Sequence, residues 1–219
     1  MNKVLTMVLG VVFLTTTVSG SFGIFPQKKF IYNPKSGSVI YKPHLSYVGV
    51  RLGGNLANVS GEGESDARLG VSVIGLVDYS FTNSVSLITG LGYSQKGAKR
   101  SVVTMKNDYL TVPVQFNYTL STNGSALLHA FAAGGVNFHV FGGGYLGYLL
   151  SAKQGSEDVK SQTESLDFGV TAGLAVTKTI ENHMIRLDVA YELGLANQAT
   201  SGEDFKNRVF ILGLSYLFY

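Results

Sequence analysis

The final stretch of the chain, residues 206–219, alternates between two kinds of side chain, and this pattern restricts the fold more than any other feature. One face of this stretch is apolar and aromatic throughout: Phe210, Leu212, Leu214, Tyr216 and Phe218. The other face is mixed and includes Gly213 and Ser215. Exposed on the edge of a soluble sheet, the apolar face would be prone to aggregation. We therefore expect a closing strand of a membrane β-barrel, which inserts with one face toward lipid and the other toward a packed lumen.

The same period of two recurs through most of the chain from residue 44 onward. It is clearest in 45–57, 68–79, 84–96, 108–119, 165–178 and 183–195. In each segment one face is apolar and the other is small or polar, which is typical of half-buried strands. A soluble sandwich of two sheets would give the same alternation, so the strands by themselves leave both folds open.

The lengths of the connections distinguish between these folds. Long hydrophilic connections lie at 58–68, 97–107, 153–165 and 196–207, and brief ones at 80–84, 120–125 and 180–183. Outer-membrane barrels have this asymmetry, with long loops outside and short turns in the periplasm. The sequence therefore predicts an all-β fold, an eight-stranded antiparallel up-and-down transmembrane β-barrel with both termini in the periplasm.

The strand count depends on how residues 126–152 are interpreted. This glycine-rich stretch is roughly twice as long as a strand needs to be to cross a bilayer. We expect one long strand, kinked at its glycines, whose outer half extends above the membrane and pairs with 158–165. The alternative is a periplasmic insertion at 126–135.

Composition and the first residues indicate export to an envelope membrane. Only 14% of the residues are charged, where about 25% is usual for soluble domains. Residues 1–20 combine Lys3, an apolar run and small residues at 18–20, as a cleaved signal peptide does. We expect a signal peptide at 1–20, an irregular periplasmic segment at 21–43 and an outer-membrane barrel domain at 44–219. The absence of cysteine excludes disulfides and thiolate chemistry, and the scattered basic residues predict no nucleic-acid partner.

Several segments give the chain a resemblance to a known family. They are 49–56 (GVRLGGNL), 90–99 (GLGYSQKGAK), 109–114 (YLTVPV), 144–153 (GYLGYLLSAK) and the near-terminal 216–218 (YLF). These segments resemble the PorT-like family of outer-membrane β-barrel proteins (outer membrane protein beta-barrel domain). The resemblance implies the barrel fold, residence in the outer membrane and, for the founding member, a role in protein secretion across that membrane. The motifs are turn glycines and strand patterns, so they specify a fold and not an activity.

Polar residues on the inward faces are the main candidates for a site. They are Arg51, Asp78, Gln115, Arg186, Asp188 and Glu192. The interior of an eight-stranded barrel is just wide enough for side chains to fill it, and unpaired charges there would be costly. We therefore expect a structural network of paired charges and not an ion path.

No residue pattern indicates catalysis, a metal or a cofactor. The histidines His44, His129, His139 and His183 show no Ser/His/Asp arrangement of the kind that a lipid-modifying hydrolase needs. The triple glycine at 142–144 is not followed by Lys-Ser/Thr, so it indicates a strand kink or close packing and not a phosphate loop. The acidic stretches 62–66 and 157–164 lack the spacing of a calcium loop and are interpreted as solvated loops. We expect no enzymatic activity, no cofactor and no metal.

Three functions are compatible with these features. The first is a structural or accessory role in the envelope, assisting protein secretion as the resemblance implies. The second is surface binding or adhesion through the long extracellular loops, and the third is a lipid-modifying enzyme. The expected partners are outer-membrane lipid and lipopolysaccharide, the outer-membrane barrel-assembly machinery and components of a secretion system. The protein itself is expected to be a monomer.

Overall fold

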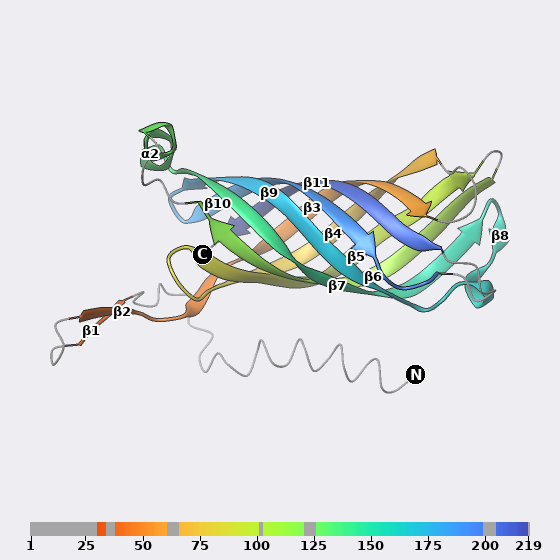
Figure 1. Ribbon diagram of the computed structural model, residues 1–219, viewed down its shortest axis with the longest axis horizontal. Helices are drawn as coiled ribbons and strands as arrows, with labels where there is room; N and C mark the ends of the chain where they lie inside the picture. Colours follow the sequence, from red (N-terminus) through yellow and green to blue (C-terminus); the bar gives the residue numbers. More distant parts are fainter. Residues whose placement is uncertain are drawn as a thin grey trace.

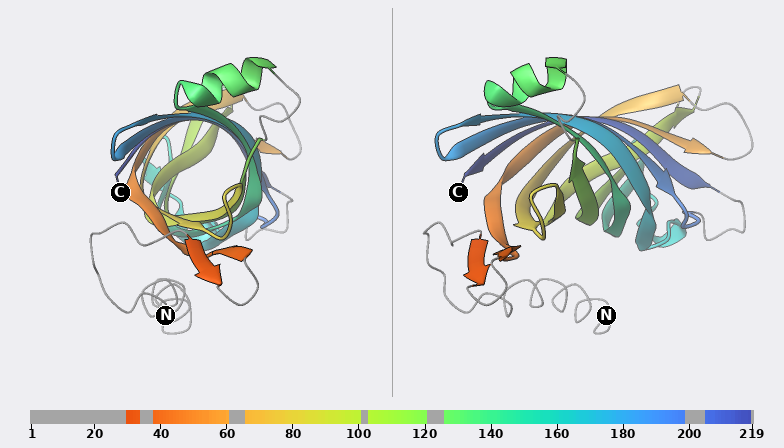
Figure 2. Two further views of the ribbon diagram at one scale, coloured as in Figure 1. Left: turned by 90° about the vertical axis from the view of Figure 1, so that its left-hand side faces the viewer. Right: turned by 60° about the vertical axis from the view of Figure 1, so that its left-hand side comes forward.

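The computed structural model describes residues 30–33, 38–60, 66–100, 103–120, 126–198 and 205–218. Within these residues, antiparallel strands form one closed barrel with a round cross-section (Figures 1 and 2). The eight barrel strands are β3 (His44–Ser60), β4 (Asp66–Ser80), β5 (Val85–Arg100), β6 (Val103–Thr119), β7 (Val136–Gln154), β9 (Leu166–Ile180), β10 (His183–Gly194) and β11 (Lys206–Phe218). Each pairs with its neighbours in chain order, so the predicted eight-stranded up-and-down barrel is confirmed.

Side chains alternate between the two sides of this wall. In β10 and β11 every second residue is buried in the lumen, and the residues between them face outward. Other strands also present large aliphatic residues on the outside, such as Leu52, Leu146 and Leu174, so an apolar surface surrounds the barrel. The outward residues of β11 are the predicted Phe210, Leu212, Leu214, Tyr216 and Phe218.

The first and last barrel strands close the wall. β11 pairs with β10 on one side and with β3 on the other, where Leu217 lies opposite Gly49. Gly49 permits this close approach, because a Cβ at that position would clash with the carbonyl oxygen of Tyr216. At Gly54, further along the same strand, a Cβ would meet nothing within 4 Å. Closure leaves the barrel wall without an exposed edge.

The two ends of the barrel differ. One end, here called the turn end, contains the start of β3, the end of β11 and the brief turns at 81–84 and 181–182 (left in Figure 1). The opposite end, here called the loop end, contains the connections from β3 to β4, β5 to β6, β7 to β9 and β10 to β11. The predicted alternation of long and short connections holds only in part, because β5 and β6 are joined at the loop end by residues 101–102 alone, whereas β6 and β7 are joined at the turn end by residues 120–135.

Two of the expected long loops are folded. Most of 97–107 is strand, because β5 and β6 continue to Arg100 and Val103 with Ala98 opposite Met105. In these outer parts polar and apolar residues no longer alternate, so the pattern that marks strands in the sequence disappears while backbone pairing continues. The expected loop at 153–165 contains β8 (Glu157–Asp158) and the 3-10 helix η1 (Lys160–Gln162).

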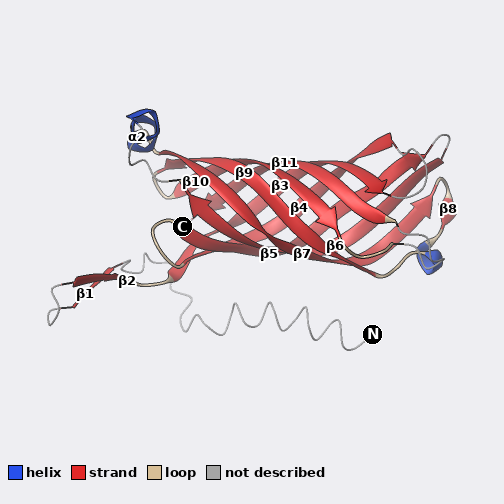
Figure 3. Cartoon of the chain, viewed as in Figure 1, coloured by secondary structure: helices blue, strands red, loops and turns tan. Residues whose placement is uncertain are grey.

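The prediction of one long strand at 126–152 is wrong. α2 (Ala126–Ala133) is a separate helix at the turn end, and β7 begins only at Val136 (Figures 1 and 3). The helical sequence, ALLHAFAA, consists mainly of alanine and leucine and lacks a period of two. Gly135 follows the helix with a φ of +77°, a conformation that glycine adopts without strain. The alternative interpretation, an insertion at 126–135, is therefore correct. The expected outer pairing is present in the contact of β7 with β8 and in backbone hydrogen bonds from Val159 to Ala152 and from Leu149 to Ser165.

The segment before the barrel is less irregular than expected. Within 21–43, β1 (Phe30–Asn33) and β2 (Ser38–Tyr41) form a separate two-stranded hairpin. Each strand has only four residues, which is too short to show a period in the sequence. The expected signal peptide at 1–20 lies outside the described residues. In the part of the chain that the structure describes, no helix combines the length and apolar character needed to span a membrane.

Candidate functional site

The lumen contains two layers of buried charge, and the first lies nearer the turn end. Arg51 of β3 is ion-paired with Asp188 of β10, and its Nε also donates to Asp188 Oδ1 at 3.2 Å. Arg186 Nε lies 3.9 Å from the same carboxylate oxygen, and its Nη1 donates to Asn117 Oδ1 at 3.0 Å. Gly213 leaves room for this contact, because a Cβ there would lie 2.7 Å from Asp188 Oδ2. One carboxylate thus faces two guanidinium groups.

The other two predicted lumen residues on this side, Asp78 and Gln115, differ from each other in their surroundings. Asp78 is buried, with only 7% of its surface exposed, and lies near enough to Arg186 to interact with its charge. Gln115 is half-buried and, among the described contacts, takes part in none of the ion pairs. The lumen therefore brings Arg51, Asp78, Arg186 and Asp188 together and leaves Gln115 aside.

The second charged layer lies toward the loop end and centres on Lys96. Lys96 Nζ lies 3.1 Å from Asp167 Oδ2, 2.9 Å from Glu192 Oε2 and 3.6 Å from the centroid of the Tyr145 ring. Lys96 and Asp167 are each only 1% exposed. An ammonium group so deeply buried requires compensating charges and hydrogen bonds. Glu192 is the member of this layer that was among the predicted residues.

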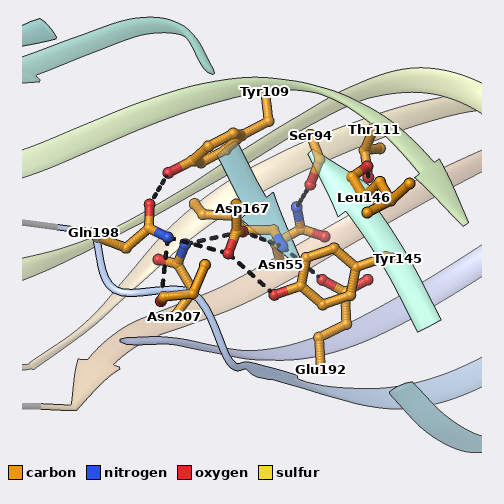
Figure 4. Close-up of polar contacts among 12 residues, drawn as sticks. Asn55, Ser94, Tyr109, Thr111, Tyr145, Leu146, Asp167, Glu192, Gln198 and Asn207 are labelled. Carbon is orange, nitrogen blue, oxygen red and sulfur yellow. Dashed lines mark hydrogen bonds and ion pairs between the residues drawn. The ribbon is translucent and has the colours of Figure 1, made fainter. Parts of the chain in front are cut away.

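Neutral side chains hold Asp167 from several sides (Figure 4). Asn207 Nδ2 donates to Asp167 Oδ2 at 3.0 Å, and Gln198 Nε2 donates to Oδ1 at 3.2 Å. Tyr145 Oη also donates to Oδ1, at 3.4 Å. Tyr109 Oη in turn donates to Gln198 Oε1 at 2.6 Å. These contacts join side chains of β6, β7, β9 and β11 with the segment after β10, so they cross the lumen.

The sequence contained a signal for part of this second layer. Lys96 and Asp167 both fall on the small or polar face of their strands, so their inward direction follows from the alternation. Gln198 and Asn207 fall in the expected loop at 196–207, where no face can be assigned from the sequence. The pairing itself depends on how strands distant in sequence face each other across the barrel, and no local pattern encodes that.

Between the first charged layer and the turn end, the lumen widens into a cavity of about 280 Å³. Tyr47 and Met184 supply apolar surface. Met184 belongs to a buried apolar cluster with Ile88 and Leu217, and the partly buried Tyr47 packs against this cluster. Asp78 is the charged residue among the described lining residues. The polar lining is mostly hydroxyl and amide groups: Ser46, Ser80, Thr82, Asn83, Ser84, Ser86, Asn117, Thr119, Asn137, Thr177 and Thr179, with His139.

The histidines do not form a catalytic arrangement in the described structure. Their hydrogen-bond partners are Lys42 and Ser46 for His44, Asn117, Thr119 and Thr177 for His139, and Tyr216 for His183. His129 is exposed on α2. Among the described residues, no group of three or more His, Asp or Glu side chains could hold a metal ion.

The triple glycine belongs to β7 and serves close strand packing. A Cβ at Gly143 would clash with the carbonyl oxygen of Val114 on the neighbouring strand. Gly142 and Gly144 lie on either side within the same regular ladder, opposite β6 and β9. A phosphate-binding loop requires a strand-to-helix turn, and this segment is continuous strand.

The closed wall, the apolar outer surface and the filled lumen define an integral β-barrel protein of the outer membrane. A family model described as "Outer membrane protein beta-barrel domain" matches residues 35–199, and the chain belongs to this family. A search of curated proteins finds no significant match.

Solved structures show the same fold. The chain is similar to Neisserial surface protein A (NspA), with 13% identity, a TM-score of 0.51 and coverage of 80% of this chain and 97% of that one. It is also similar to Ail, the attachment invasion locus protein of Yersinia pestis, with 18% identity, a TM-score of 0.44 and coverage of 79% and 99%. At these identities the likeness concerns the fold alone.

Proposed function

We propose that this protein is a non-conducting structural or accessory barrel of the outer membrane, which holds binding surfaces at the two membrane faces. The observation that carries the proposal is the buried layer of Lys96, Asp167 and Glu192, whose ion pairs cross the lumen. A solute would have to break these pairs to pass, and the liberated charges would be left in a low-dielectric interior. An eight-stranded barrel has no spare width for a second route.

Reconstitution of the purified chain into a planar lipid bilayer tests this proposal. We expect no stepwise ion conductance across the voltage range in which porins conduct. A reproducible single-channel conductance from the folded barrel would contradict the proposal. The folded state is verified by the mobility difference between boiled and unboiled samples on a gel.

Assistance of protein secretion is the finer form of the accessory role. Its support is the PorT-like resemblance of 49–56, 90–99, 109–114 and 144–153, and the proposed docking sites are the turn end and the loop end. In this proposal the outer-membrane barrel-assembly machinery recognises the C-terminal strand through Phe210, Leu212, Leu214, Tyr216 and Phe218.

The test is a comparison of exported and surface proteins between wild type and a deletion strain. We expect loss of a defined set of exported proteins, restored by the full-length chain expressed from a plasmid. An unchanged profile would exclude the secretion role and leave a purely structural one.

Surface binding is the second candidate, and the folded loop end favours it. Residues 155–165 form a cap over that end, in which Val159 packs into a buried cluster with Leu149 and Ala152. Glu157, Asp158 and Lys160 are exposed on this cap. If the cap binds a surface ligand, their joint replacement by alanine should reduce bacterial retention on coated surfaces as much as deletion of the whole gene. Unchanged retention in the deletion strain would exclude adhesion.

A further inference from the structure

We propose that the cavity at the turn end is a binding pocket for a neutral, polyhydroxylated ligand of the size of one sugar ring. Its volume of about 280 Å³ lies near the lower limit of roughly 300 Å³ for small-molecule sites. In the expected orientation of the barrel the pocket opens to the periplasm. The inference goes beyond the accessory role, because it concerns a ligand site inside the wall.

An unpartnered acceptor lies in this pocket. Asp78 lines the cavity and is 7% exposed, and within the described residues its Oδ1 atom has no hydrogen-bond partner. A buried carboxylate oxygen without a partner is costly unless something else donates to it. The other buried side-chain oxygens without partners among the described residues belong to residues that do not line the cavity. Asp78 is therefore the one described lining residue that also has a buried carboxylate oxygen without a hydrogen-bond partner.

The wall around Asp78 offers fixed donors and acceptors. Asn117 Nδ2 can only donate, and it lies 3.3 Å from His139 Nδ1, so this nitrogen accepts. His139 Nε2 then carries the hydrogen and donates to Thr177 Oγ1 at 2.8 Å. Thr119 Oγ1 lies 3.1 Å from the same Nδ1. The imidazole is thus a neutral relay between β6 and β9, and the hydroxyl hydrogen of Thr177 remains available to a ligand.

The combination of walls selects the chemical class. A sugar ring has hydroxyl groups around its edge and C–H groups on its face. The hydroxyl, amide and carboxylate groups of the pocket suit the edge, while the ring of Tyr47 and the side chain of Met184 suit the face. No lysine or arginine is among the described lining residues, so an anionic ligand would meet only the charge of Asp78. A neutral polyol can donate to the Asp78 carboxylate without introducing a second buried charge.

Ligand-observed NMR titration of the full chain in phospholipid nanodiscs tests the proposal. Nanodiscs avoid alkyl glycoside detergents, whose sugar headgroups would compete. The probes are glucose and N-acetylglucosamine, and putrescine serves as a cationic ligand without hydroxyl groups. We expect saturable binding of at least one sugar, and a roughly tenfold or greater loss of affinity in Asp78→Asn, since an acceptor bearing charge is replaced by a neutral amide.

Asp108→Asn is the matched control. Asp108 also has an oxygen without a hydrogen-bond partner among the described residues, but it lies near the loop end and does not line the cavity. Its replacement should leave sugar affinity unchanged. If Asp78→Asn fails to give a heat-modifiable barrel, the pair Tyr47→Ala and Tyr47→Phe replaces it, and the alanine variant should lose binding that the phenylalanine variant retains.

Three results would overturn the proposal. The first is the absence of saturable binding by both sugars to the wild-type barrel. The second is equal sugar affinity in wild type and Asp78→Asn, or in the Tyr47 pair. The third is binding of putrescine in place of the sugars, which would make the cavity a cation site.

Discussion

Two buried aspartates, one in each half of the lumen, have different surroundings. Near the loop end, Asp167 is ion-paired with Lys96 and accepts hydrogen bonds from Asn207 and Gln198. Near the turn end, Asp78 keeps one oxygen without a partner among the described residues and lies beside a cavity. Both carboxylate oxygens of Asp167 accept hydrogen bonds from other segments and so hold strands together, whereas one carboxylate oxygen of Asp78 accepts none among the described residues. The difference fits the proposal that the lumen beside Asp78 binds a ligand, whereas the layer around Asp167 holds the strands of the barrel together.

The largest expected effect comes from Lys96→Met, which leaves the carboxylates of Asp167 and Glu192 buried without their cation. We expect a loss of about 3–5 kcal/mol in the free energy of unfolding, because breaking a buried pair exposes an uncompensated charge. The measurement is urea unfolding of the barrel in phospholipid vesicles, followed by gel mobility.

A combined variant separates charge from packing in this layer. Lys96→Met together with Asp167→Asn and Glu192→Gln removes the carboxylate charges as well, so it should recover most of the lost stability. If the combined variant is as unstable as Lys96→Met alone, the loss comes from packing and the electrostatic account of the layer is wrong.

Asp167→Asn by itself should cost less than Lys96→Met. Lys96 keeps Glu192 as a partner at 2.9 Å, while the hydrogen bonds from Asn207 and Gln198 lose their charged acceptor. We expect a loss of about 2–3 kcal/mol, measured by the same unfolding experiment. An unchanged free energy of unfolding would show that the hydrogen bonds accepted by Asp167 contribute little to stability.

Packing density provides a comparison without charge. Ala152 is fully buried in the cluster with Tyr109 and Leu149, whereas Thr179 lines the turn-end cavity. Ala152→Leu should destabilise by about 1–3 kcal/mol through overpacking, and Thr179→Leu should change the free energy of unfolding by about 0.5 kcal/mol or less. Equal losses in the two variants would mean that the turn end is as tightly filled as the loop end.

The smallest expected effect is that of Asp78→Asn on stability. Asparagine gives up the attraction to Arg186 but also removes the desolvation cost of a buried carboxylate with one unpartnered oxygen. The two effects offset each other, so we expect a change within about 0.5 kcal/mol, or a small gain, as is common where a residue serves binding at the expense of stability. The reference is Asp167→Asn, which makes the same chemical change in the other half. A loss for Asp78→Asn as large as that for Asp167→Asn would assign Asp78 a structural role.

The sequence predicted the wall of the barrel well because one local rule determines it. Each strand that crosses the apolar band must alternate, so Leu212 and Leu214 are identifiable as outward-facing from their neighbours alone. The rule fails where the surroundings are no longer apolar on one side. It missed the outer parts of β5 and β6, where polar and apolar residues no longer alternate, and it misread 126–133, where an apolar run is helical.

The site was less predictable than the wall for a different reason. Inward direction follows from alternation, so Arg51, Arg186 and Asp188 could be selected as lumen residues from the sequence. Which charged side chains form ion pairs depends on the tilt and stagger of the strands in the closed barrel. These place Lys96 of β5 against Asp167 of β9 across the lumen. A cavity depends on the volumes of side chains from many strands together, and no single segment records it.

The pairing of β3 with β11 has a consequence for the chain before the barrel has closed. Val48 lies opposite Phe218, so the seam joins the two extremes of the barrel domain. Until β11 is in place, β3 has no hydrogen-bonding partner on that side, and its unpaired backbone groups can pair with other strands. Contacts of such long sequence separation also form slowly. Loss of β11 would therefore leave β3 and β10 as open edges that can pair with other strands, and would not yield a slightly smaller barrel.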